Sequence, residues 1–228
     1  MAIPSEVVIL DPLHIEVQVE EVLRYLGYPA GARPGERACE GIQAAIQAAR
    51  LRQRPRGMYA VHRIASMGRH SLELDQGTVF TGTIGEFLEG ATHAAVFVAT
   101  AGAEVELLED EAARGKDPMM DLALHAVGAQ LAEAAVELLM EDLRRRLDPG
   151  EALTLRYSPG YCGIHLRQQS AVFGLLDTRR IRVELLPSML MKPLKSVSGV
   201  VGIGPASAVH AYGNPCDACP MTTCAMRR

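Results

Sequence analysis

A Pro-Gly turn between an arginine and a tyrosine is the first group of residues in this sequence that could bind a ligand. The segment reads Arg156-Tyr-Ser-Pro-Gly-Tyr161, and Pro159-Gly160 are the residues preferred at the centre of a type II turn. Gly160 permits a positive φ and a close ligand approach because it has no Cβ. Arg156 could hold a carboxylate with two hydrogen bonds, and Tyr161 could cover an apolar or cationic group. The same pattern also fits a plain turn that ends a strand.

A long helix is predicted upstream of this turn. Residues 119–147 carry apolar side chains at helical spacing, with Asp117 as a potential N-cap, Pro118 at the first helical position and Gly150 beyond the end. The apolar side chains form two nearly opposite stripes. This pattern predicts a helix that is buried on two sides.

Glu133 falls on one of these apolar stripes at about 100° per residue. A carboxylate among apolar neighbours needs a partner or a ligand. An ion pair to a core arginine is the structural alternative to a ligand. Glu137 and Glu141 lie near the edge of the same stripe, and their helical spacing predicts ion pairs with Arg145.

The last part of the chain concentrates three cysteines that could bind a metal. Cys216, Cys219 and Cys224 lie within nine residues, and His210 lies six residues before the first of them. Clustered thiolates suit an iron–sulfur cluster or a zinc ion, with His210, Cys162 or an external group as the fourth ligand. A tail that binds no metal is the third alternative.

The composition is that of a folded protein and excludes several function classes. Hydrophobic residues make up 48% of the chain, and 23 Lys and Arg against 27 Asp and Glu give a net charge of −4, which argues against a nucleic-acid partner. Aromatic residues make up only 4%, with no Trp, so base-stacking surfaces are not expected. The N-terminus lacks the basic region of a signal peptide, so we expect a soluble, cytoplasmic protein without a membrane partner.

Outside the long helix, the sequence alternates short helical and strand-like segments. Helices are predicted at 20–26 and 39–51, with a helical turn at 84–88. The strand-like segments are 5–19, 60–64, 78–81, 94–99, 152–155 and 196–204. No domain boundary is indicated before about Pro205, so we assign one domain to residues 1–204 and a cysteine-rich tail to residues 205–228.

Four short motifs of this chain occur together in one known family. They are Leu131-Ala-Glu-Ala134, Arg156-x-Ser-Pro-Gly-Tyr161, Ser188-Met-x-Met191 and Ser196-Val-Ser-Gly199. In this order and spacing, over roughly residues 95–204, they resemble the activation domain of cobalamin-dependent methionine synthase. The combination is more specific than any one motif. The chain is similar to a free-standing version of that domain, without the folate, homocysteine and corrinoid-carrying modules.

The resemblance implies a fold and a ligand. The fold would be α+β, with a curved, twisted antiparallel sheet and flanking helices. The ligand would be S-adenosylmethionine, and cobalamin would be carried by a partner. Arg156 would hold the ligand's carboxylate, while Ser158 and Gly160 would offer backbone contacts. Tyr161 would line the same pocket, and Glu133 would contact a polar part of the ligand.

The function implied by the resemblance is that of an accessory component of a cobalamin-dependent methyltransferase. The chain would assist reductive remethylation of the corrinoid on a corrinoid protein or methyltransferase, with a flavoprotein as a candidate reductant. As an enzyme it would be a methyltransferase reactivation component. One alternative is a non-catalytic interaction module for a corrinoid protein, in which the cysteine tail binds a structural metal ion. The other is an iron–sulfur electron carrier.

Overall fold

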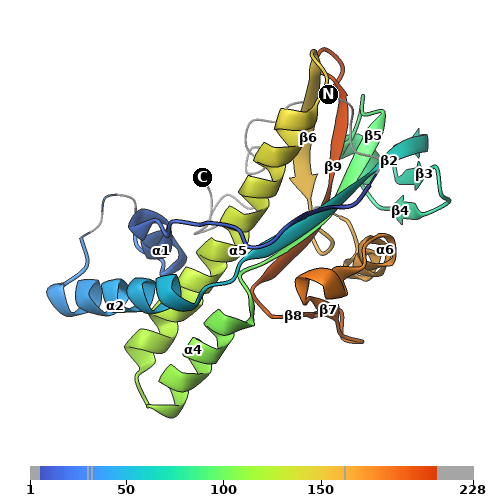
Figure 1. The fold of residues 1–228 in the computed structure, drawn as a ribbon. Helices are drawn as coiled ribbons and strands as arrows, with labels where there is room; N and C mark the ends of the chain where they lie inside the picture. Colours follow the sequence, from blue (N-terminus) through green and yellow to red (C-terminus); the bar gives the residue numbers. More distant parts are fainter. Residues whose placement is uncertain (1–5, 30, 32, 162, 210–228) are drawn as a thin grey trace.

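An antiparallel sheet forms the centre of the fold, and one long helix crosses it and continues beyond it (Figure 1). The computed structural model describes residues 6–29, 31, 33–161 and 163–209. The helices of four or more residues are α1 (Val19–Tyr25), α2 (Glu36–Arg52), α3 (Ile84–Phe87), α4 (Ala103–Arg114), α5 (Pro118–Arg146) and α6 (Gln169–Leu175). The strands are β1 (Val8–Leu10), β2 (Arg56–Gly68), β3 (Ser71–Leu74), β4 (Val79–Thr81), β5 (His93–Thr100), β6 (Glu151–Tyr157), β7 (Glu184–Leu185), β8 (Met191–Lys192) and β9 (Ser196–Pro205).

The main sheet has seven strands in the order β4-β3-β2-β5-β9-β6, with β1 paired to β2. Its pairings are all antiparallel among the described residues. Central strand β5 is buried along nearly its whole length because helices cover both faces of the sheet. The strand β6 forms one edge of the sheet. The α+β fold with an antiparallel sheet and flanking helices is therefore confirmed.

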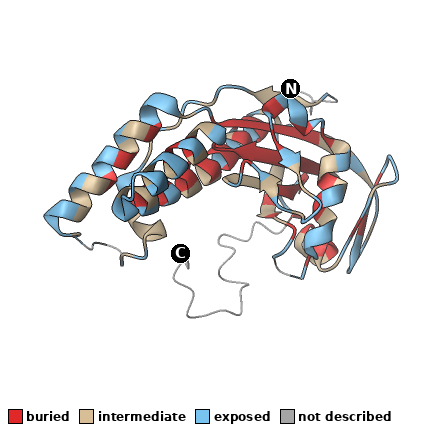
Figure 2. Ribbon diagram, turned by 90° about the horizontal axis from the view of Figure 1, so that it is seen from below, coloured by how far each residue is buried: buried red, intermediate tan, exposed pale blue. Residues whose placement is uncertain are grey.

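Three apolar clusters hold these layers together, and α5 contributes to two of them. On one face of the sheet, Phe97 of β5 packs in the same cluster as Leu139 of α5. On the other face, Val96 packs in a cluster that includes Val172 of α6. The third cluster lies among α1, α2, α4 and the first half of α5. Figure 2 shows buried residues along the sheet and on the inner sides of the helices.

The helix α5 begins and ends within one residue of the predicted bounds. The side chain of Asp117 accepts a hydrogen bond from the Met120 backbone N–H at 3.0 Å, and Pro118 occupies the first helical position. By length and composition α5 could cross a membrane, but 61% of its most apolar window is buried inside the protein. The helix is therefore a core helix with two buried sides.

The remaining predictions of secondary structure are partly correct. The short helices and the helical turn are confirmed as α1, α2 and α3. The predicted strand over 5–19 is wrong beyond Leu10, because the backbone of residues 11–18 makes no strand pairing and passes over α5 instead. The helices α4 and α6 and the strands β3, β7 and β8 were not predicted. In α4 the apolar signal is weak, because only Val105 and Leu108 are buried among many charged residues.

The predicted ion pairs from Glu137 and Glu141 to Arg145 are wrong. Arg145 Nη2 donates to Asp142 Oδ1 at 3.2 Å, and Glu137 faces a different arginine. Arg145 pairs with Asp142 because other hydrogen-bond donors already hold the Asp142 carboxylate in place. It accepts hydrogen bonds at 2.8 Å from the fully buried Tyr59 hydroxyl and from Arg146 Nε.

The Asp142 network ties α5 to β2 inside the core. Burial alone would raise the pKa of Asp142, but hydrogen bonds from Arg146, Tyr59 and Arg145 outweigh burial and hold this pKa below its ordinary value. Burial and the same hydrogen bond raise the pKa of Tyr59. A carboxyl with a depressed pKa in the folded state stabilises the fold above its unfolded pKa, and this stabilisation is lost as the pH falls through the folded pKa.

We predict that Asp142→Ala lowers the free energy of unfolding at neutral pH by about 2–4 kcal/mol, because the Tyr59 hydroxyl loses its acceptor. Urea unfolding measures this loss. The control Glu141→Ala removes an exposed carboxylate from the next position and should change stability by less than about 0.5 kcal/mol. The difference between wild type and Asp142→Ala should shrink as the pH falls below the unfolded pKa of aspartate. A difference that stays constant with pH would contradict this account.

Candidate functional site

Arg156 joins the edge strand β6 to α5 through two carboxylates. Its Nη2 lies 2.6 Å from Glu133 Oε2 and 3.2 Å from Glu137 Oε1. The side chains of Arg156, Glu133 and Glu137 are 25%, 36% and 51% exposed, so the cluster lies at the edge of the core. Two of the predicted site residues, Glu133 and Arg156, are therefore in contact. The arginine that was the structural alternative for Glu133 is Arg156 itself.

A β-bulge turns Arg156 toward α5. The register of β6 against β9 shifts between Leu153 and Arg156. In a regular strand, residues three apart point to opposite faces. Here Leu153 packs in the cluster that α5 shares with the sheet, and Arg156 also reaches α5. The bulge therefore places both side chains on the α5 face, and the adjacent Tyr157 lies in the core of the other face.

The end of β6 is held in place from the opposite face. The ring of Tyr157 stacks on Phe87 with centroids 4.1 Å apart. A Cβ on Gly199 of β9 would lie 2.6 Å from the Tyr157 carbonyl oxygen and 2.7 Å from the Phe97 ring. Glycine in the Ser196-Val-Ser-Gly199 motif is therefore required by close packing. This packing fixes the position of the segment that follows Tyr157.

The predicted type II turn is present directly after β6. The Tyr161 N–H donates to the Ser158 carbonyl at 3.2 Å, and Gly160 has a φ of +97°. The Gly160 N–H donates to the Ile164 carbonyl at 2.7 Å, so this donor is already used within the protein. The Tyr161 side chain is 70% exposed. Of the predicted contacts on this turn, the Tyr161 side chain is the most accessible to a ligand.

Two buried polar atoms near this cluster have no hydrogen-bond partner among the described residues. They are Arg156 Nη1, a donor, and Gln130 Oε1, an acceptor. Gln130 is only 6% exposed and lies one helical turn before Glu133 on α5. Buried polar atoms without partners are rare in folded proteins. These two atoms indicate where an acceptor and a donor from a ligand could bind.

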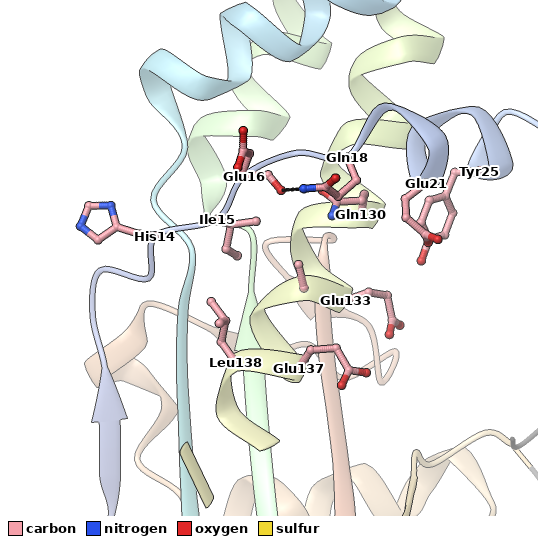
Figure 3. Close-up of a pocket in the computed structure, with 11 residues that line it drawn as sticks. His14, Ile15, Glu16, Gln18, Glu21, Tyr25, Gln130, Glu133, Glu137 and Leu138 are labelled. Atoms are coloured by element: carbon pink, nitrogen blue, oxygen red, sulfur yellow. Dashed lines mark hydrogen bonds between the residues drawn. The ribbon is translucent and has the colours of Figure 1, made fainter. Parts of the chain in front are cut away.

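A pocket of about 400 Å³ opens beside Glu133 and Glu137. Its walls are α5, α1 and the backbone segment that leads into α1 (Figure 3). The lining residues are His14, Ile15, Glu16, Gln18, Glu21, Tyr25, Gln130, Glu133, Ala134, Glu137 and Leu138. Figure 3 shows Glu133 and Glu137 projecting from the same side of α5. The pocket volume suits a small organic ligand.

Sequence reasoning missed the wall that the N-terminal part contributes. Glu16, Gln18, Glu21 and Tyr25 are ordinary polar or aromatic residues in sequence, and no spacing relates them to α5. Gln130 had a usable signal, because it is a polar residue on the apolar side of α5, as Glu133 is. Of the remaining predicted residues, Cys162, His210, Cys216, Cys219 and Cys224 lie outside the described residues. Within residues 6–209 as described, no three His, Cys, Asp or Glu side chains are grouped to hold a metal.

The fold and the site together define a class of domain. It is an α+β domain in which an arginine at the edge of an antiparallel sheet meets glutamates of a core helix beside a pocket. A solved structure titled "Crystal Structure of the MetH Reactivation Domain bound to AdoHcy" has this fold, with a TM-score of 0.64 over 92% of this chain and 82% of the solved chain, at 18% sequence identity.

The sequence itself identifies the family. Residues 85–217 match the model of the family described as "Vitamin B12 dependent methionine synthase, activation domain". This span is more than half of the chain, and the chain belongs to this family. The predicted resemblance is therefore confirmed. A comparison with curated proteins found no match.

We predict that Arg156 interacts more strongly with Glu133 than with Glu137, because the Glu133 contact is shorter and less exposed. Double-mutant cycles in urea unfolding, with Arg156→Met, Glu133→Gln and Glu137→Gln, measure both coupling energies. The expected values are about 1 kcal/mol for Glu133 and below about 0.5 kcal/mol for Glu137. Equal or reversed coupling energies would show that the two contacts are not ranked as the structure has them.

Proposed function

We propose that this protein binds S-adenosylmethionine beside Arg156 and assists reductive remethylation of a corrinoid carried by a partner. The observation that carries the proposal is the buried Nη1 of Arg156, which has no hydrogen-bond partner among the described residues, although Nη2 of the same guanidinium contacts two glutamates that line the acidic pocket. Membership of the activation-domain family supports the corrinoid context. The solved relative is a reactivation domain bound to AdoHcy, which supports a ligand of this chemical type.

The residues present fit the amino-acid end of such a ligand. Arg156 Nη1 offers N–H groups to a carboxylate, and Gln130 Oε1 offers an acceptor to an N–H donor. Glu133 offers a carboxylate to a polar or cationic part of the ligand, and the exposed ring of Tyr161 would cover it. Ser158 and Gly160 would contribute backbone carbonyls, since the Gly160 N–H is already used. When bound, S-adenosylmethionine supplies the methyl group.

The role of this chain in the proposed function is positioning. Arg156 and Glu133 lie on two elements, β6 and α5, that are fixed in the core, so a bound ligand would be held in one orientation. The corrinoid would belong to a corrinoid protein or methyltransferase, and a flavoprotein would supply the electron. We place this activity in the cytoplasm.

A second candidate function is a non-catalytic interaction module for a corrinoid protein. The observation that favours it is the complete use of Arg156 Nη2 within the protein, by Glu133 and Glu137. If these ion pairs are purely structural, the acidic pocket has no ligand. Ligand binding to wild-type protein separates the two functions.

We predict that wild-type protein binds S-adenosylmethionine saturably in calorimetry and that Arg156→Ala weakens binding about thirtyfold, the equivalent of about 2 kcal/mol. The matched control is Arg145→Ala, which removes another ion-paired arginine, one that pairs with Asp142 and not with the lining residues Glu133 and Glu137. This control should bind like wild type. An absence of heat with wild-type protein at millimolar ligand would leave the interaction module as the function.

We also propose that Cys216, Cys219 and Cys224 hold an iron–sulfur cluster that relays the electron, with a structural zinc site as the alternative. Removal of residues 210–228 tests this role, because the truncation leaves Val209, which is buried in the core, in place. The truncated protein is expected to bind S-adenosylmethionine normally, to lose visible cluster absorbance after anaerobic purification, and to reactivate the corrinoid more slowly. Full reactivation by the truncated protein would exclude the relay.

A further inference from the structure

The pocket beside α5 carries more negative charge than its neighbours neutralise. Among the described residues that line it, four are glutamates and none is lysine or arginine. Glu21 is paired with Arg24 at 2.6 Å. Glu133 and Glu137 share the single guanidinium of Arg156. Glu16 has no ion pair among the described residues.

A second, independent observation indicates that this pocket accepts a donor or a cation. Gln130 lines the pocket, is 94% buried, and its Oε1 has no donor among the described residues. A buried amide oxygen without a donor costs free energy. An N–H group or a positive charge on a ligand would satisfy this oxygen and the surplus carboxylates together. A neutral N–H donor would satisfy the amide oxygen alone, and an anionic ligand would add to the surplus of negative charge.

Glu137 is the carboxylate that the pocket leaves least neutralised on α5. Two other carboxylates take most of the nearby positive charge. Arg156 Nη2 is 0.6 Å closer to Glu133 than to Glu137, and Arg145 pairs with Asp142. The Glu137 side chain is 51% exposed, so it can turn toward a ligand without unpacking the core. Opposite charges a few ångströms apart at a partly buried site attract strongly enough to change a binding constant about five- to tenfold.

We propose that Glu137 makes the pocket select its ligand by positive charge, so that the sulfonium S-adenosylmethionine binds more tightly than the thioether S-adenosylhomocysteine. This inference rests on the proposed function and adds a specificity-determining residue to it. The two compounds share the adenosine and amino-acid parts and differ in one methyl group and one positive charge. Arg156 recognises the carboxylate that both carry, and therefore binds both, whereas Glu137 distinguishes them.

Calorimetric titration of both compounds into wild type and Glu137→Gln tests the proposal. The amide keeps the size of the side chain and an acceptor for Arg156 but removes the charge. The ratio of the two dissociation constants, thioether over sulfonium, is expected to fall about fivefold in Glu137→Gln. In wild type the same ratio should fall as salt is raised, because salt screens the attraction.

Two further variants serve as control and as second test. Glu141→Gln neutralises an exposed carboxylate one turn further along α5 that does not line the pocket, and its ratio should equal that of wild type. Glu16→Gln removes the lining carboxylate that has no ion pair among the described residues and should also lower the ratio, so the proposal stays testable if Glu137→Gln misfolds. An unchanged ratio in both pocket variants, with wild type binding both compounds, overturns this inference and leaves the proposed function intact. Failure of wild type to bind either compound overturns both.

Discussion

The structure depends on a single constraint: α5 must pack in two cores at once. Its first half lies among α1, α2 and α4, and its second half covers one face of the sheet. A helix in this position has little room for buried polar side chains, so each polar side chain that it buries needs a partner. Asp142 has Tyr59 and Arg146, and Glu133 has Arg156. Gln130 Oε1 has no hydrogen-bond donor among the described residues, and this residue lines the pocket beside α5.

The ion pairs of Arg156 also explain why the site lies at the edge of the sheet. Among the described strands, β6 has only one neighbour, β9, so Arg156 lies at the margin of the sheet, on the face that α5 covers. The β-bulge turns Arg156 to the α5 face, and the Tyr157–Phe87 stack holds the strand from the opposite face. The Nη2 atom of this guanidinium pairs with the two glutamates, and its Nη1 atom, which has no partner among the described residues, is where we propose that a ligand binds. The same arrangement gives positioning without requiring a large movement.

Some of this architecture could be predicted from sequence because its signals are local. The N-cap at Asp117, the apolar stripes of α5 and the Pro159-Gly160 turn each depend on neighbours in the chain. The pairing of Glu133 with Arg156 is not local, because it depends on the register of β6 against β9 and on a β-bulge. The residue types in β6 do not predict this bulge. For the same reason Arg145 was paired with the wrong residues, because the buried hydroxyl that selects Asp142 comes from β2. The pocket wall from residues 14–25 could not be predicted, since nothing in its sequence relates it to α5.

The central claim is that the Arg156 guanidinium, held between Glu133 and Glu137, is where the ligand's carboxylate binds. The most direct measurement follows the arginine side-chain Nε–H signals in ¹H–¹⁵N NMR spectra during titration with S-adenosylmethionine, with the Arg156 signal assigned by its loss in Arg156→Lys. The account predicts that the Arg156 signal shifts saturably while the signals of Arg145 and Arg146, which are paired with Asp142, stay in place. Saturable shifts elsewhere in the spectrum with an unchanged Arg156 signal would contradict it.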